Sequence, residues 1–190
     1  YSYGFSLLTT HMLVGSNIYC SCPDILSKNF FEYIEKHKYN SIHGVPFTYE
    51  WFYKMRLGDL SLSTINYMTQ AGGKLNESLT RYFIDVSSSK DFKFFKMYGQ
   101  TEATARMAFI PPDKLESKIN SIGIAIPDGY LEIDNGEIVY SGRNVFLGYA
   151  TNRDDLSYSK QSYKLHTGDK GYKDEDGYFY LTGRDKNFMK

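Results

Sequence analysis

The N-terminal half of the chain switches repeatedly between helical spacing of apolar side chains and short continuous apolar runs. Gly15 ends the first helical stretch, and Asn76 is suited to cap the last one. Strands and helices that alternate at this spacing predict βαβ units, that is, a parallel sheet flanked by helices. Helices are expected at residues 5–14, from near Ser27, at 47–57 and at 76–86, and strands at 17–20, 41–43, 65–69 and 92–97.

The pattern changes after about residue 103, where strand-like segments follow one another. Residues 131–134 and 137–140 flank Asn135-Gly136, which is a strong signal for a tight hairpin. Asp176-Gly177 makes a similar turn before residues 178–181. We therefore predict an α/β fold in which the sheet with its helices is followed by a distorted antiparallel barrel-like portion. The expected division is an α/β subdomain at 1–103, a mainly β subdomain at 104–184 and a short terminal segment at 185–190.

Net charge and the length of the apolar runs argue against two classes of partner, nucleic acids and membranes. Lys and Arg total 22 and Asp and Glu total 22, so the formal net charge is zero. A nucleic-acid-binding surface normally carries a basic surplus, and we do not expect nucleic acid as the main partner. The apolar runs are shorter than the roughly 18 to 20 residues that span a bilayer, and we do not expect a membrane protein.

The cysteines and the first residue bear on the setting of the chain. Cys20 and Cys22 form one Cys-x-Cys, which is too little for a disulfide framework and lacks a second pair for zinc. A reduced, cytoplasmic setting is therefore expected. The chain begins at Tyr1 without a signal-like stretch, and its first residues look like the middle of a domain. We expect an internal fragment of a longer protein.

Three loops leave the carboxyl ends of predicted strands, where open α/β sheets bind their ligands. They are residues 44–46, 71–74 and 98–102. Gly72 and Gly73 bring no side chains, so a flat ring could lie on their backbone, although an ordinary turn before a helix is the more common reason for such glycines. We expect the three loops to converge on one site.

The loop at residues 98–102 reads Tyr-Gly-Gln-Thr-Glu. Tyr98 could stack on a ring, Thr101 could donate to a phosphate oxygen, and Glu102 offers the hard oxygen that suits magnesium. The alternative is a buried Tyr followed by a Thr that caps a short helix with Glu in its first turn. A complete pentapeptide at a strand end favours the phosphate and magnesium site.

Asp169 follows His166-Thr167-Gly168, and Arg184 lies fifteen positions later. A carboxylate has two oxygens suited to the paired hydroxyls of a ribose, and Arg184 could donate to the same sugar. A salt bridge between the two is the alternative, and it is compatible with sugar binding. His43 is better explained as a core histidine than as a pocket residue. Neither a phosphate-binding Gly-x-x-x-x-Gly-Lys-Ser/Thr loop nor a Gly-x-Gly-x-x-Gly motif occurs.

With these motifs in this order, the chain resembles the adenylate-forming enzymes, which include acyl-CoA synthetases, luciferase and the adenylation domains of peptide synthetases. The resemblance runs nearly from end to end and is specific, because six or more elements match in order. The matching elements are residues 1–15, 44–46, 71–75, 98–102, 136–138, 148–149, 166–169, 174–178 and 183–186.

The resemblance implies a role for each matched position. The adenine site would be lined by Gly72, Gly73 and Lys74, with Tyr98 stacked on the base. Gly99 and Gln100 would complete the nucleotide-binding turn, Thr101 would contact the α-phosphate as a catalytic residue, and Glu102 would bind magnesium in catalysis. The ribose would be held by Asp169 and Arg184, and the acyl pocket would be bordered by Tyr3, Val45 and Gly72. Lys186 would mark the hinge to a small C-terminal domain.

The implied reaction is activation of a carboxylic acid by ATP to an acyl-adenylate, followed by transfer to a thiol of CoA or of a carrier protein. Positioning and charge neutralisation would carry most of such a transfer. The phosphate loop and the lysine-bearing C-terminal domain of such enzymes fall outside these residues, so we expect the fragment alone to be inactive.

Three other functions are weighed against this one. Amino-acid-activating members of the family carry an aspartate where this chain has Ser2, and an ammonium would lack its partner there, so a plain carboxylic acid is favoured. A nucleotide-binding module without catalysis is the second, and the presence of Thr101, Glu102, Asp169 and Arg184 disfavours it. The third is an unrelated α/β interaction domain in which every motif is structural.

Overall fold

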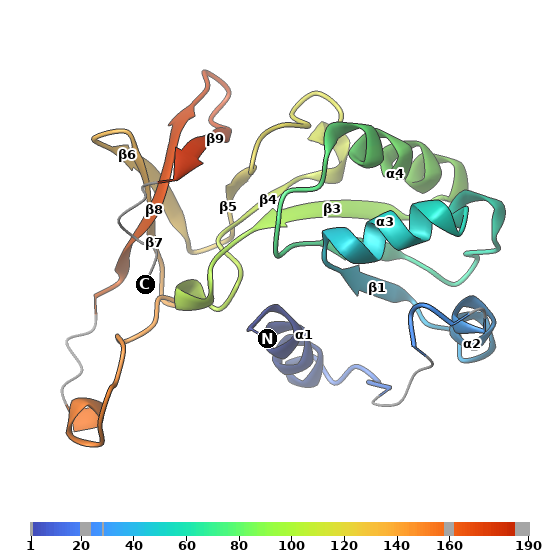
Figure 1. Ribbon diagram of the computed structural model, residues 1–190, viewed down its shortest axis with the longest axis horizontal. Helices are drawn as coiled ribbons and strands as arrows, with labels where there is room; N and C mark the ends of the chain where they lie inside the picture. Colours follow the sequence, from blue (N-terminus) through green and yellow to red (C-terminus); the bar gives the residue numbers. More distant parts are fainter. Residues whose placement is uncertain (1, 20–23, 28, 158–161, 185–190) are drawn as a thin grey trace.

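The computed structural model describes residues 2–19, 24–27, 29–157 and 162–184 (Figure 1). The Cys20-x-Cys22 pair, Lys186 and the predicted terminal segment at 185–190 lie outside the described residues. The helices are α1 (Ser2–Leu13), α2 (Phe30–Lys36), α3 (Pro46–Lys54) and α4 (Glu77–Lys90), with short 3-10 turns η1 (Leu57–Asp59), η2 (Thr101–Ala103), η3 (Pro112–Lys114) and η4 (Asp154–Ser157). The strands are β1 (Ser41–Gly44), β2 (Tyr67–Gln70), β3 (Lys93–Tyr98), β4 (Ala108–Ile110), β5 (Ile124–Ala125), β6 (Tyr130–Asp134), β7 (Glu137–Ser141), β8 (Lys164–Lys173) and β9 (Phe179–Arg184).

The first sheet has the order β1-β2-β3-β4-β5. β1, β2 and β3 pair in parallel, which confirms the predicted sheet, and β4 and β5 extend it by antiparallel pairing. The sheet is therefore mixed, because the chain turns back directly after β3 without a crossover helix. β4 and β5 belong to this sheet although they follow residue 103, and the proposed division of the chain there stays a prediction.

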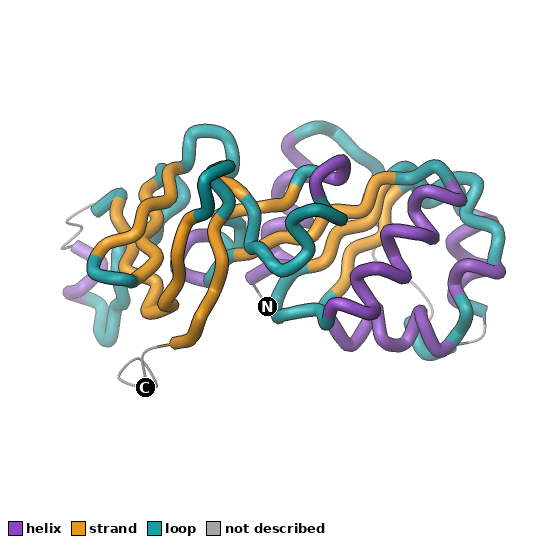
Figure 2. The backbone as a smooth tube through the Cα atoms, turned by 90° about the horizontal axis from the view of Figure 1, so that it is seen from above, coloured by secondary structure: helices purple, strands orange, loops and turns teal. Residues whose placement is uncertain are grey.

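Side chains alternate between the two faces of the first sheet. Ile42, Met68 and Phe94 lie in register on the three parallel strands and belong to a core that includes buried side chains of α3 and α4. Figures 1 and 2 show these two helices together on one face of the sheet. On the other face, Tyr3 and His11 of α1 hydrogen-bond to side chains of β2. The space between α1 and the strands is thus built from the alternate strand positions.

Local chemistry explains where α4 begins and ends. Asn76 accepts a hydrogen bond from the Leu79 backbone N–H at 2.8 Å, which confirms the predicted cap. At the other end, Asp91 takes a left-handed conformation that stops the helix and returns the chain to β3. These two signals fix the direction in which β3 enters the sheet.

The second sheet has the order β6-β7-β8-β9 and is antiparallel throughout, as predicted for this half of the chain. Asn135 and Gly136 both have positive φ, at 49° and 79°, which is the backbone of the two-residue hairpin turn that the sequence indicates. Register shifts interrupt the β7–β8 and β8–β9 ladders beside Gly168 and Gly171, which accounts for the distortion. Figure 2 shows this sheet at the opposite end of the molecule from α3 and α4.

The bounds of several elements differ from the predicted ones, and three differences have a visible cause or consequence. Residues 16–19 lie outside any strand and are exposed, so the predicted strand at 17–20 is wrong in its described part. α2 begins at Phe30, later than expected. α3 ends at Lys54 because Arg56 adopts a left-handed backbone with φ at 53°.

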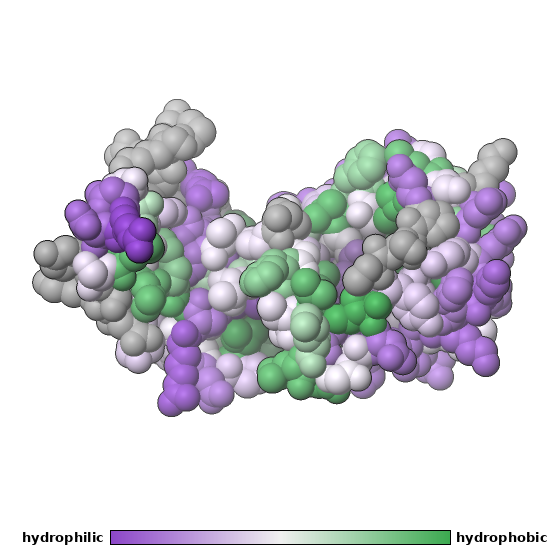
Figure 3. Space-filling view, turned by 90° about the horizontal axis from the view of Figure 1, so that it is seen from below, coloured by the Kyte–Doolittle hydropathy of each residue, from purple (hydrophilic) through white to green (hydrophobic). Residues whose placement is uncertain are grey.

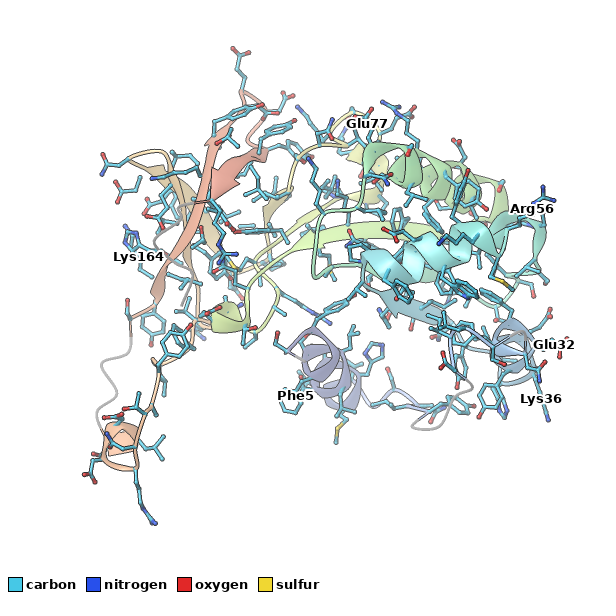
Figure 4. All side chains as sticks on the ribbon, viewed as in Figure 1. Phe5, Glu32, Lys36, Arg56, Glu77 and Lys164 are labelled. Atoms are coloured by element: carbon cyan, nitrogen blue, oxygen red, sulfur yellow. The ribbon has the colours of Figure 1, made fainter. Side chains whose placement is uncertain are left out.

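The outer side of α1 is apolar and exposed. Figure 3 shows apolar side chains gathered over this part of the lower face, and Phe5, which is 67% exposed, points away from the sheet in Figure 4. Met12, Leu13 and Val14 are exposed as well. Within the described residues, none of the helices has the length and apolarity required to cross a membrane.

Candidate functional site

The turn after β3 folds back tightly on itself. A Cβ on Gly99 would lie 2.3 Å from the Ala105 carbonyl oxygen, so only glycine permits this approach. Thr104 and Ala105 then take left-handed backbones, with φ at 53° and 63°, before β4 begins. The doubled chain presents Thr101 and Glu102 at the carboxyl end of β3, where the sequence predicts a ligand site.

A cleft of about 530 Å³ opens beside this turn. It brings together eleven of the twelve residues predicted for the site, which are Tyr3, Gly72, Gly73, Lys74, Tyr98, Gly99, Gln100, Thr101, Glu102, Asp169 and Arg184. Val45 is the exception, because it packs against the small cluster of Tyr3, Ala71 and Ala105 instead of lining the cleft. The first sheet, the tight turn and the second sheet therefore all contribute to one wall.

Asp169 is held at the second-sheet end of the cleft. The Tyr98 hydroxyl donates to its Oδ2 at 2.5 Å, Gln100 Nε2 donates to the same oxygen at 3.2 Å, and Arg184 Nε lies 3.6 Å from Oδ1. Burial and the hydrogen bond to this carboxylate raise the pKa of Tyr98, so the phenol stays protonated and remains a donor. The predicted ion pair between Asp169 and Arg184 is thus present, and it leaves a carboxylate oriented toward the cleft.

Thr101 and Glu102 line the same cleft from the turn after β3. Thr101 Oγ1 and Ser2 Oγ share a hydrogen bond of 3.0 Å, which ties α1 to the turn. The Tyr149 hydroxyl donates to the Glu102 carboxylate, and this bond raises the pKa of Tyr149. The Phe146 backbone N–H donates to the Glu102 carbonyl oxygen at 2.7 Å. Two residues of the loop that follows β7 therefore fix the position of Glu102.

Glu102 fits a magnesium ion by its chemistry. Magnesium in nucleotide sites is held by one or two carboxylates together with phosphate oxygens and water, so a single carboxylate at a phosphate site suffices. In the part of the chain that the structure describes, no group of three or more His, Cys, Asp or Glu side chains could hold a metal ion by itself. The site therefore suits an ion that arrives with a nucleotide.

Backbone lines the cleft at the end of β2. Gly72 has φ at 79°, and Gln70 Nε2 donates to the carbonyl oxygens of Ala71 at 3.2 Å and Gly73 at 2.9 Å. The Gln70 side chain is fully buried and holds the glycine turn open. A planar group could lie on this exposed backbone, as the sequence suggests for Gly72 and Gly73.

Comparison with known proteins decides the family. The family model described as AMP-binding enzyme matches residues 1–150. The chain belongs to the AMP-binding enzyme family. A 2-succinylbenzoate–CoA ligase of Bacillus cereus is 31% identical over 140 residues, which cover 68% of this chain and 28% of that protein.

Solved structures show the same fold for this AMP-binding chain. The N-terminal domain of FACL13 from Mycobacterium tuberculosis has a TM-score of 0.79 at 17% identity and covers 96% of this chain and 48% of that one. The o-succinylbenzoate CoA synthetase of Bacillus subtilis, solved with ATP and magnesium, has a TM-score of 0.73 at 24% identity and covers 96% and 39%. The chain thus spans less than half the length of these proteins.

The cleft also contains residues that the motifs did not single out. Lys96 is buried, and its Nζ donates to the Ile119 carbonyl oxygen at 2.5 Å. Burial and the neighbouring Lys74 lower the pKa of Lys96 to about 8. A lysine at an inward position of an apolar strand was the signal that could have identified it. The other cleft residues missed from the sequence are Gln70, Met97, Ala105, Asn120, Ser121, Ile122 and Leu181. Ser2, which the sequence singled out only for the choice of acid, lines the cleft as well.

Proposed function

We propose that the full-length protein joins a carboxylic acid to the thiol of CoA in two steps that use ATP. A carboxylate oxygen attacks the α-phosphorus, the bond to the β-phosphate oxygen breaks, and pyrophosphate leaves. The thiol sulfur then attacks the acyl carbonyl, its proton is released, and AMP departs. Both steps need a nucleotide held next to the acid, with its phosphate charge neutralised.

The observation that carries this proposal is the convergence of distant segments in one cleft. The turn with Thr101 and Glu102, the glycine loop at Gly72 and the pair of Asp169 and Arg184 line the same space. A nucleotide supplies a base, a sugar and phosphates, and each of these three segments suits one of them. An interaction domain whose motifs were merely structural would have no reason to bring them together.

Each segment would have a separate task. Asp169, fixed by Tyr98 and Gln100, offers carboxylate oxygen to the sugar hydroxyls. Thr101 can donate its hydroxyl to a phosphate oxygen, and Glu102 would hold magnesium, which neutralises phosphate charge when bound. Gly72 and Tyr98 would flank the base. Val45, which packs against the cluster of Tyr3, Ala71 and Ala105, would act on the acyl group only through those side chains.

The acid is proposed to be one without an amino group next to the carboxylate. Ser2 lines the cleft and hydrogen-bonds to Thr101, and the carboxylates among the described cleft residues are those of Glu102 and Asp169. An ammonium group at Ser2 would therefore lack an ionic partner. The 2-succinylbenzoate–CoA ligase relative uses CoA by its name, which favours CoA over a carrier protein as acceptor.

Two measurements on the full-length protein test the proposal. Isothermal titration should show binding of AMP, and a panel of carboxylic acids should include members that cause ATP-dependent release of pyrophosphate. Binding of AMP with no pyrophosphate from any acid, with or without CoA, would instead identify a nucleotide-binding module. Pyrophosphate released only with amino acids would overturn the choice of substrate.

A further inference from the structure

A second space lies between α1 and the first sheet, on the face opposite α3 and α4. It has a volume of about 240 Å³ and continues into a larger one of about 710 Å³ along the end of α1. The two share Leu7, His11, Ser16 and His43, and the smaller one shares Met97 with the nucleotide cleft. We call the smaller space the α1 cavity; it is lined by Leu7, Thr10, His11, Val14, Ser16, His43, Tyr67, Thr69, Met97 and Arg106.

Arg106 is placed in the α1 cavity by the same turn that builds the nucleotide site. It follows the two left-handed residues after Thr101–Ala103, and its backbone N–H donates to the Ala103 carbonyl oxygen at 3.2 Å. Asn144 Nδ2 donates to the Arg106 carbonyl oxygen at 2.8 Å. The backbone is therefore held by two hydrogen bonds, and the side chain lines the space between α1 and the sheet.

The guanidinium of Arg106 is incompletely satisfied. Its Nη2 donates to Thr10 Oγ1 at 3.4 Å, a long hydrogen bond, and its buried Nε has no hydrogen-bond partner. The residue as a whole is half-buried. An arginine keeps its charge under all ordinary conditions, and withdrawing part of that cation from water without an anion beside it costs free energy. A carboxylate is the group that best satisfies Nε and a terminal nitrogen together, because it can accept two parallel hydrogen bonds.

The described residues around Arg106 in the α1 cavity supply no such anion. None of the described residues that line the α1 cavity is an Asp or Glu. The other titratable groups facing Arg106 are His11 of α1, His43 of β1 and Tyr67 of β2. His43 bonds to Thr69 and Ser41, and its pKa is lowered to about 4 by burial and by the neighbouring His11 and Arg106. The described lining of the cavity thus carries the fixed positive charge of Arg106 together with hydrogen-bonding side chains, and has no carboxylate.

We propose that the α1 cavity holds the far end of the acyl substrate and that Arg106 binds a second carboxylate there, so the substrate is a dicarboxylic acid. This inference rests on the proposed function. The reacting carboxylate lies at the cleft end near Thr101, and the chain of the acid passes Met97 into the cavity. Arg106 then selects diacids, because a methyl-ended acid leaves the guanidinium both desolvated and unpaired.

The test compares matched acids in the full-length protein. The pairs are adipate with hexanoate, suberate with octanoate, and phenylpropionate with and without an ortho carboxylate. The readout is kcat/KM for pyrophosphate release, expressed as the ratio of diacid to monoacid. Wild-type protein should favour the diacid by about tenfold or more in at least one pair, the size expected when one charged hydrogen-bonded contact is gained.

Arg106→Gln should lower this ratio by about ten- to hundredfold, and Arg106→Lys should restore part of it. Arg153→Gln, which removes the same charge at an exposed position, should leave the ratio unchanged. A purely structural role for Arg106 would lower both rates equally, and an unchanged ratio would overturn the inference. If Arg106→Gln is not recovered folded, the wild-type ratio and the lysine variant decide.

The outcomes also separate the inference from the proposed function. Wild-type protein that activates monoacids at least as well as every matched diacid refutes the role of Arg106 and leaves acid activation intact. Wild-type protein that binds AMP and activates neither member of any pair, nor any other carboxylic acid, refutes the proposed function and this inference with it.

Discussion

The nucleotide cleft and the α1 cavity lie on either side of Met97 and are built in different ways. The cleft is formed by loops, glycines and short polar motifs that leave strand ends. The cavity is formed by side chains of α1 and of the strands β1, β2 and β3, and Arg106 is the permanent charge among its described lining residues. Under the proposed function, backbone and motif residues would bind the nucleotide in the cleft, and the side chains that line the α1 cavity would bind the acid.

The two regions also differ in charge. The cleft has Glu102 and Asp169 beside Lys74, Lys96 and Arg184, so a nucleotide bound there with a metal ion would meet charges of both signs. The α1 cavity has cationic and neutral groups without a carboxylate among its described lining residues. The following predictions test whether the two regions act separately.

The largest expected effect is in the cleft, at Glu102. Glu102→Gln removes the charge that would hold magnesium, and pyrophosphate release should fall by roughly a hundredfold or more. The diacid-to-monoacid ratio should not change, because the acid end at Arg106 is untouched. Glu116→Gln, an exposed carboxylate, is the matched control. A protein whose Glu102→Gln variant keeps full activity does not use this residue in catalysis.

Asp169→Asn should weaken AMP binding by about ten- to hundredfold, because the amide accepts at only one atom and carries no charge. Isothermal titration of the full-length protein measures it, with Asp113→Asn at an exposed site as control. Equal affinity of the variant and wild type would place the ribose elsewhere in the cleft.

Gly99→Ala tests whether both regions depend on one turn. The new Cβ would meet the Ala105 carbonyl oxygen at 2.3 Å, and the backbone must move, at a cost of about 1–3 kcal/mol in the free energy of unfolding. Because Ala105 precedes Arg106, both AMP affinity and the acid ratio should change. Gly4→Ala has no atom within 4 Å of its Cβ and should leave thermal stability equal or slightly higher. A Gly99→Ala protein with the same melting temperature as wild type would show that the turn adjusts to the new Cβ at little cost in free energy.

The smallest effect is a pH dependence at His43. Its pKa is lowered to about 4 in the folded chain, so the unfolded chain binds more protons as the pH falls below the ordinary value of 6.5. Stability should therefore decrease on acidification across this window, by about 1 kcal/mol between roughly pH 7 and pH 5.5. His43→Gln should remove this part of the slope in urea unfolding at several pH values. An unchanged slope would mean that His43 titrates normally.

Much of the fold could be predicted from local pattern. The parallel order of β1, β2 and β3, the Asn76 cap and the Asn135-Gly136 hairpin all follow from short-range signals, because spacing and turn chemistry act over a few residues. The same reliance on short-range signals made the predicted strand at 17–20 wrong in its described residues, since an apolar run does not show whether a partner strand is present. The antiparallel addition of β4 likewise depends on a turn with two left-handed residues that are not glycine.

The sequence by itself determined the family, the motif residues of the nucleotide cleft and the strand ends that carry them, because these depend on residue identity at fixed spacing. Only the tertiary structure decided that Val45 packs against the cluster of Tyr3, Ala71 and Ala105, and that Lys96 enters the cleft. It also decided that Arg106 lies partly buried in the cavity that His11, His43 and Thr10 line. Whether a side chain is buried, and whether it has a hydrogen-bond partner, depends on contacts between elements that are distant in the sequence. A sequence motif therefore cannot predict them, since each of these residues is of a common type in its own helix, strand or loop.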